Sequence, residues 1–166
     1  MNIELLKRIL TFIILCLVQA LVLNHICLFG CATPLLYVYL VMTFRRNQPK
    51  WSLLLWCFAM GLIMDMFSNT PGVASASMTL VGLLQPYILG MFIQRDSPDD
   101  LEPSIKSIGL TSYLYFSIII VLLYCLTFFT LEAFSFFNWL QWIECIGGST
   151  LLTVILILVI DNIKKR

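Results

Sequence analysis

Long apolar runs alternate with short polar stretches along the chain. The clearest pair of runs lies between positions 51 and 86 and flanks a polar corner that contains Asp65, Asn69, Pro71 and Gly72. Proline and glycine at such a corner end one helix and start the next, because proline has no amide hydrogen and glycine accepts turn conformations. At about 1.5 Å of rise per residue, each run is long enough to cross most of a hydrocarbon layer roughly 30 Å thick. The pattern therefore predicts a hairpin of two membrane helices.

The same alternation over the remaining sequence predicts an all-α fold. We expect a polytopic integral membrane bundle in one transmembrane domain, residues 1–166, with six spans at about 5–25, 28–44, 51–67, 73–93, 108–131 and 142–160. The second span is the least regular, because Gly30 and Pro34 interrupt it. The pattern leaves open whether that span is straight or broken at Pro34.

Composition supports a membrane protein. Apolar residues make up 60% of the chain and charged residues 11%, and the mean hydropathy is +0.96. A water-soluble domain of this size could not enclose so much apolar sequence in one core. The chain also has no basic patch of the kind that binds nucleic acid, so we expect no nucleic-acid partner.

The distribution of basic residues predicts the orientation of the chain. Lys7 and Arg8 precede the first span, whereas Arg45, Arg46 and Lys50 follow the second. Cytoplasmic loops of membrane proteins carry an excess of lysine and arginine. Two crossings between the clusters place both in the cytoplasm, and six spans place both termini there. This arrangement puts all 10 basic residues on the cytoplasmic side.

Few polar residues fall within the predicted spans. They are Gln19, Asp65, Gln85 and Glu144, and each needs a hydrogen-bonding partner in a medium without water. Asp65 either accepts hydrogen bonds from backbone amides of the turn at 69–72 or contacts a partner or a translocated ion. Small residues recur at helical spacing in span 73–93 and predict a face buried against another helix, formed by Ser75, Thr79, Gly82, Pro86 and Gly90.

Features of an enzyme are scarce. His25 is the sole histidine, and the sequence has no recognisable nucleophile motif, metal-ligand cluster, phosphate loop or dinucleotide fingerprint. We therefore expect no catalytic residue, no cofactor and no metal. A membrane-embedded enzyme is the weakest of the functional classes considered.

The corner carries a resemblance to a known family. The string from Gly61 to Gly72, GLIMDMFSNTPG, followed by a small-residue helix ending at Gln85 and Pro86, resembles the central signature of the rod shape-determining membrane protein MreD. Leu28-Phe29-Gly30 with Pro34, the basic pair after span two, the chain length and six spans are also similar to that family.

The resemblance implies a non-enzymatic scaffold in the bacterial inner membrane. MreD proteins work beside the bitopic protein MreC and are linked to the MreB filament, the glycosyltransferase RodA and a class B penicillin-binding transpeptidase. Their fold is thought similar to the substrate-binding subunits of energy-coupling-factor transporters. By this resemblance, Asp65, Asn69, Pro71 and Gly72 shape a periplasmic surface for MreC. The basic surface formed by Arg45, Arg46 and Lys50 then faces the filament or anionic membrane lipids.

The main alternative is a small-molecule transporter or a vitamin-binding transporter subunit. Such a protein also has about six spans, but it needs a cavity in which polar groups converge. Gln19, Asp65 and Gln85 form such a cavity only if their side chains face a common centre. The sequence does not decide between this arrangement and the scaffold.

Overall fold

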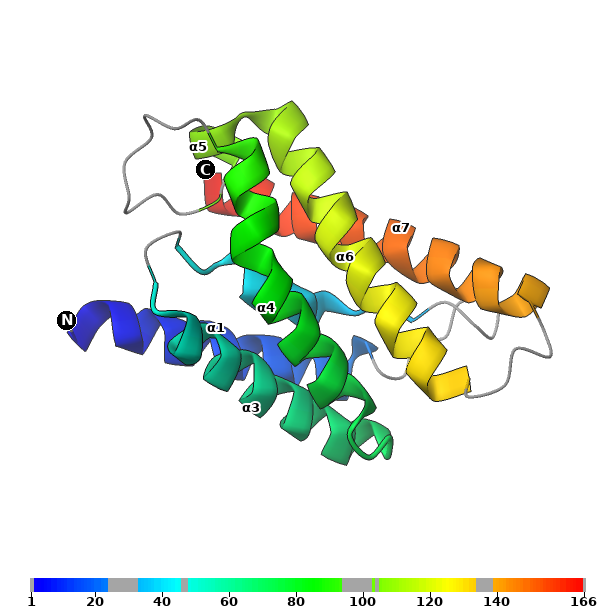
Figure 1. Ribbon diagram of the computed structural model, residues 1–166. Helices are drawn as coiled ribbons and strands as arrows, with labels where there is room; N and C mark the ends of the chain where they lie inside the picture. The colour runs from blue at the N-terminus through cyan, green and yellow to red at the C-terminus, as the bar shows by residue number, and fades with distance from the viewer. Residues whose placement is uncertain are drawn as a thin grey trace.

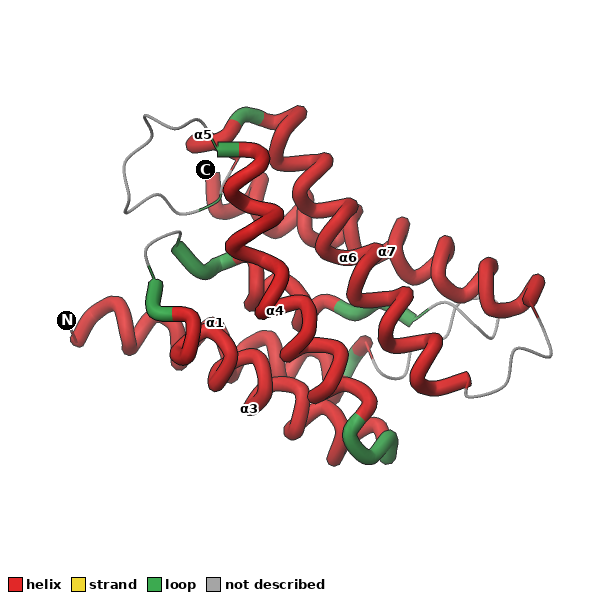
Figure 2. The backbone as a smooth tube through the Cα atoms, in the orientation of Figure 1, coloured by secondary structure: helices red, strands yellow, loops and turns green. Residues whose placement is uncertain are grey.

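The computed structural model describes residues 2–23, 33–45, 48–93, 103, 105–133 and 139–165. Every regular element within these ranges is a helix (Figures 1 and 2), which confirms the all-α prediction for this part of the chain. The elements are α1 (Asn2–Leu21), the 3-10 helix η2 (Leu36–Val38), α2 (Tyr39–Met42), α3 (Lys50–Ser68), α4 (Val73–Phe92), α5 (Ile105–Ile108), α6 (Leu110–Ala133) and α7 (Trp139–Lys165).

Four of these helices are long and apolar enough to cross a membrane. The apolar segments are Lys50–Ser68, Val73–Phe92, Leu110–Glu132 and Trp142–Ile163. Helix α1 has 20 residues as well, but its first two turns contain the charged residues Glu4, Lys7 and Arg8. Length and composition thus give the protein the character of a transmembrane helical protein.

Helices α3 and α4 form the predicted hairpin, and their bounds differ from spans 51–67 and 73–93 by one residue at most. Two glycines let the antiparallel helices approach each other. A Cβ atom added at Gly61 would lie 2.3 Å from the Ser75 Cα, and one added at Gly82 would lie 2.8 Å from the Cys57 Sγ. Gly61 has room for a hydrogen atom only, because the nearest atoms belong to the backbone, whereas at Gly82 the nearest atom is the end of a side chain. The hairpin is closely packed at both positions.

The segment expected as the second span is not one continuous helix in its described part, residues 33–45. It has no regular secondary structure at 33–35 and then forms η2 and the single turn α2. Its side chains from Pro34 to Met42 are all buried, and the segment passes through the middle of the molecule between the pairs α1–α3 and α6–α7 (Figure 1). In its described part, the segment is therefore irregular around Pro34, helical only from Leu36 onward, and enclosed by the surrounding helices.

The start of α1 and the start of α3 lie at the same end of the molecule. Arg8 in α1 donates a hydrogen bond to the Gln48 side chain, and its guanidinium lies 5.3 Å from the ring centroid of Phe44. Both chain termini lie at this end, on the left of Figure 1, whereas the α3–α4 corner lies at the opposite end. We call the first end the basic end, defined by Arg8, Arg45 and Lys50.

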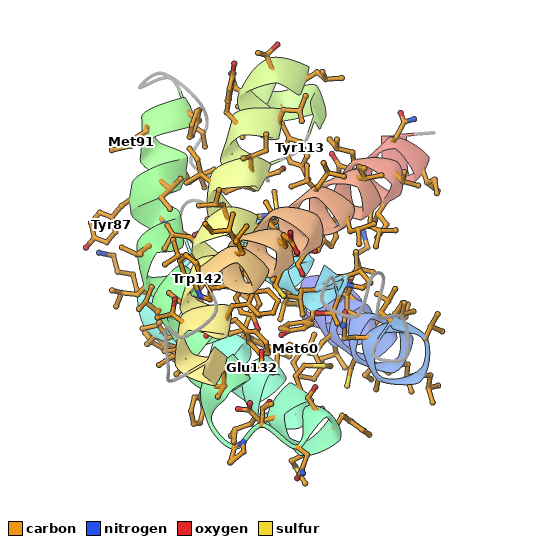
Figure 3. All side chains as sticks on the ribbon, turned by 90° about the vertical axis from the view of Figure 1, so that its right-hand side faces the viewer. Met60, Tyr87, Met91, Tyr113, Glu132 and Trp142 are labelled. Carbon is orange, nitrogen blue, oxygen red and sulfur yellow. The ribbon has the colours of Figure 1, made fainter. Side chains whose placement is uncertain are left out.

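The outer faces of the helices are apolar. On α3, Trp51 is 72% exposed, Leu55 63% and Met66 84%. Figure 3 shows Tyr87 and Met91 pointing away from the bundle, whereas the fully buried Met60 points into it. Apolar side chains on the outside of long helices are typical of contact with lipid.

The predicted small-residue face of α4 is only partly buried. Ser75 and Gly82 are buried against α3, but Gly90 is exposed, and a Cβ added there would meet no atom within 4 Å. The expectation that Gly90 serves helix packing is therefore wrong for the chain as described. The close approach of α3 and α4 therefore involves Ser75 and Gly82, and not Gly90.

Candidate functional site

The Asp65 carboxylate caps the first turn of α4. Its Oδ1 accepts hydrogen bonds from the Ala74 amide at 2.8 Å and the Thr70 hydroxyl at 3.3 Å, and its Oδ2 accepts one from the Ser75 amide at 3.0 Å. The residue before α4 is Gly72, which has no side chain with which to cap the helix. Asp65 performs that role from the preceding helix, and its negative charge is favourable at a helix N-terminus.

Burial distinguishes Asp65 from the other predicted partner-binding residues. Asp65 is 6% exposed, and the amides that it binds belong to α4 rather than to the expected turn at 69–72. Asn69, Pro71 and Gly72 are exposed. Asp65 therefore shapes the corner from inside, and the other three residues form its surface.

The turn holds that surface in a defined conformation. Asn69 ends α3 with a φ of 55°, and Gly72 precedes α4 with a φ of 85°. Both values lie in the left-handed region, which glycine and asparagine adopt at the least cost. Met66, 84% exposed, and Phe67, 59% exposed, adjoin the turn. We call the exposed residues Met66, Phe67, Asn69, Pro71 and Gly72 the corner surface.

The predicted basic surface lies at the other end of the hairpin. Lys50 is exposed at the first position of α3, and Arg45 is half-buried. Arg46, like His25, lies outside the described residues. The structure also places Arg8 at this end of the molecule. From the sequence, Arg8 was expected on the same side as Arg45 only because two membrane crossings were expected between them.

Gln19 holds the broken segment in place. Its amide nitrogen donates a hydrogen bond to the Pro34 carbonyl at 2.9 Å, and its amide oxygen accepts one from the Leu36 amide at 2.9 Å. Gln19 is 2% exposed. One side chain of α1 thus replaces two backbone hydrogen bonds that a continuous helix would have made for itself.

Helix α7 satisfies two further amides of the same segment. The Thr153 hydroxyl accepts a hydrogen bond from the Leu35 amide at 3.0 Å, and the Ser149 hydroxyl accepts one from the Thr33 amide at 3.2 Å. At the far end of the segment, Gln85 in α4 donates to the Phe44 carbonyl at 3.4 Å. Sequence reasoning gave Thr153 no role.

Buried tyrosines complete the interior. The hydroxyls of Tyr37 and Tyr124 hydrogen-bond to each other, and their rings pack edge to face at 5.5 Å. Tyr39 donates to the buried Asp161 carboxylate at 3.5 Å. Sequence reasoning missed these pairs, because tyrosine within an apolar run carries no signal of its partner.

The polar side chains considered for a transport cavity do not converge. Asp65 binds the first turn of α4, Gln19 binds residues 34–36, and Gln85 binds Phe44. Each one therefore satisfies backbone groups of the chain at a different place. Glu144, the fourth polar residue of the predicted spans, is exposed on α7.

These features define a class: an all-helical protein of transmembrane character, with an interrupted buried segment and polar side chains used for internal support. Comparison with protein-family models, with curated proteins and with solved structures gave no match.

Proposed function

We propose that this protein is a non-enzymatic scaffold subunit of the bacterial cell-elongation complex, of the MreD type. In this role it lies in the inner membrane with six spans and both termini in the cytoplasm, and it couples MreC and the MreB filament to the peptidoglycan synthases. The proposed larger complex includes RodA and a class B penicillin-binding transpeptidase. The family resemblance of the Gly61–Gly72 string supplies this role and these partners.

The observation that carries the proposal is the construction of the corner. Hydrogen bonds to Asp65 connect the end of α3 to the start of α4, so they hold the turn that carries the corner surface in one conformation. A turn that is already held in one conformation loses little conformational entropy when it binds another protein. Two apolar side chains, Met66 and Phe67, and the polar Asn69 are exposed together there. This combination suits contact with a membrane-anchored partner such as MreC.

The distribution of charge supports the proposed orientation. Arg8 and Lys50 lie at the same end as both termini, and the corner surface lies at the opposite end. The positive-inside tendency then places the basic end in the cytoplasm and the corner surface in the periplasm. In the proposed complex, the basic surface faces the filament side or anionic lipids.

The first test is co-purification of the tagged protein from detergent-solubilised native membranes, with bound proteins identified by mass spectrometry. Recovery of MreC and the wall synthases, together with round cells after depletion, supports the scaffold. Recovery of neither, with rod shape retained after depletion, contradicts it.

A second test locates the contact. Met66 at the corner and Met91 near the basic end are both 84% exposed, which makes them a matched pair for replacement by a photo-crosslinking amino acid. We expect a crosslink to MreC from position 66 and none from position 91. Crosslinks of equal yield from both positions would show that the corner surface is not the site of contact.

One observation favours the alternative of a small-molecule transporter or vitamin-binding subunit. Transporters build binding sites from discontinuous membrane helices, and residues 33–45 form such a segment. The hydrogen bonds from Gln19, Ser149 and Thr153 instead suit a closed structural segment. Thermal stabilisation of the purified protein by a vitamin, with ATPase subunits in the co-purified material, would favour transport.

A further inference from the structure

We infer that the outer face of the α3–α4 hairpin at the basic end binds one anionic phospholipid, with the phosphate at Lys50 and an acyl chain along the apolar rows beyond it. The inference requires only that the hairpin spans a bilayer. It deepens one part of the proposed function, the contact of the basic surface with anionic lipids, and it can be tested apart from the contact with MreC.

The head-group position is built by a lysine held on an aromatic ring. The Lys50 Nζ lies 5.0 Å from the centroid of the Tyr87 ring and donates to the Tyr87 hydroxyl at 3.4 Å. Lys50 begins α3, whereas Tyr87 lies in the last two turns of α4. The ammonium group therefore bridges the two helices. Contact with an aromatic face favours such a defined position of the cation.

Within the described part of the chain, the Lys50 ammonium group has hydrogen-bond donors to spare for an external anion. Among the residues that the structure describes, Tyr87 is its recorded side-chain partner, and no carboxylate pairs with it. An ammonium group has three donors, so one bond to Tyr87 leaves two for phosphate oxygens. Trp51, which follows Lys50, is 72% exposed. Tryptophan and tyrosine are typical of the depth at which lipid head groups lie.

The apolar rows continue directly from this cation. On α3, Leu54 and Phe58 follow Lys50 at steps of four residues. On α4, Leu83 and Leu80 precede Tyr87 at steps of four and three residues. The antiparallel packing, with Gly82 against Cys57 and Gly61 against Ser75, places these rows side by side. Phe58 is 48% exposed, Leu83 53% and Leu80 42%.

The length of this face is within the reach of a lipid tail. From Lys50 to Phe58 the helix rises about 12 Å at 1.5 Å per residue, a distance that an extended acyl chain covers readily. A cation at one end of a continuous apolar strip is complementary to a molecule with an anionic head and a long apolar chain. Free phosphate would use the cation but not the strip, so we assign the site to phospholipid.

Native mass spectrometry of the delipidated protein, titrated with phosphatidylglycerol, tests the inference. Lys50→Gln should weaken binding about fivefold, which corresponds to the roughly 1 kcal/mol that one basic residue contributes at an anionic membrane surface. Tyr87→Leu should weaken it in the same direction, because it removes both contacts to the ammonium group. Lys7→Gln is the matched control: Lys7 is an exposed lysine near the same end and outside the strip.

Three results would overturn the inference. Equal loss in the Lys7 and Lys50 variants would indicate diffuse attraction between charges. Equal affinity for phosphatidylcholine and phosphatidylglycerol would show that the head-group charge is not recognised. Displacement of phosphatidylglycerol by millimolar inorganic phosphate would identify a site for a free anion. Selective loss at Lys50 and Tyr87, with phosphate unable to compete, supports the lipid site.

Discussion

Replacement of Gly61 by alanine should separate the two helices of the hairpin. The added Cβ would lie 2.3 Å from the Ser75 Cα, 2.7 Å from the Ser75 amide nitrogen and 2.9 Å from the Ala74 carbonyl oxygen. All three atoms belong to the backbone, so no side chain can rotate away from the new methyl group. The helices must move apart by more than 1 Å to restore ordinary contacts of 3.4–4 Å.

The energetic cost has two parts. Forcing a methyl group into a packed interior costs about 1–3 kcal/mol. The same movement pulls Ala74 and Ser75 away from the Asp65 carboxylate, whose bonds to their amides are now 2.8 and 3.0 Å long. Hydrogen bonds to a charged group contribute about 1.5–3 kcal/mol. We therefore expect Gly61→Ala to lower the free energy of unfolding by about 3 kcal/mol.

Thermal unfolding of the purified protein in detergent measures this effect. Gly90→Ala is the control, because it lies on the same hairpin and its added Cβ meets no atom within 4 Å. Alanine also has the higher helix propensity, so Gly90→Ala should leave the melting temperature unchanged or raise it. Gly82→Ala should be intermediate, since the nearest atom is the side-chain Sγ of Cys57. Equal melting temperatures for the Gly61 and Gly90 variants would refute the close contact between α3 and α4.

Two other predictions concern buried polar side chains. Asp65→Ala should destabilise the protein by about 2 kcal/mol, because two amides of α4 lose their cap. Asp65→Asn should destabilise it less, because one acceptor oxygen remains. Equal stability of the wild type and both variants in detergent would show that the cap is unimportant. Gln19→Leu should cost about 3 kcal/mol, because it leaves a buried carbonyl and a buried amide unpaired. Gln85→Leu breaks one longer hydrogen bond and should cost less, so a larger loss of melting temperature in the Gln85 variant would contradict this assignment.

The hairpin was predictable because its signals are local. Apolar runs of membrane length fix the existence of α3 and α4, and the sequence from Asn69 to Gly72 fixes the turn between them. One of the two interpretations of Asp65, as an acceptor of hydrogen bonds from nearby backbone amides, was also within reach, since a buried carboxylate next to a turn must find donors nearby. The specific donors were not predictable, because the amides at 69–72 and those at 74–75 are similarly close in sequence.

The interrupted segment could not be derived in the same way. Pro34 signals a break, but a break within an apolar region is stable only if other elements satisfy the exposed backbone groups. One partner is Gln19 in α1. The others are Ser149 and Thr153 in α7, which lie more than a hundred residues along the chain from the amides that they bind. No periodicity within residues 28–44 contains that information.

Local sequence is enough to predict that the chain is helical and of membrane character, and that its hairpin turns at the corner after Asp65. Hydrophobicity and turn chemistry act over a few neighbouring residues, so both can be recognised without knowledge of the fold. Which polar residues form hydrogen bonds inside the protein and which face outward depends on how the helices pack. In the folded protein Asp65 is buried, and Gln19 forms hydrogen bonds with residues 34–36. Met66, Phe67 and Lys50 are exposed. These outcomes depend on where distant helices meet, because hydrogen bonds and steric contacts form only there.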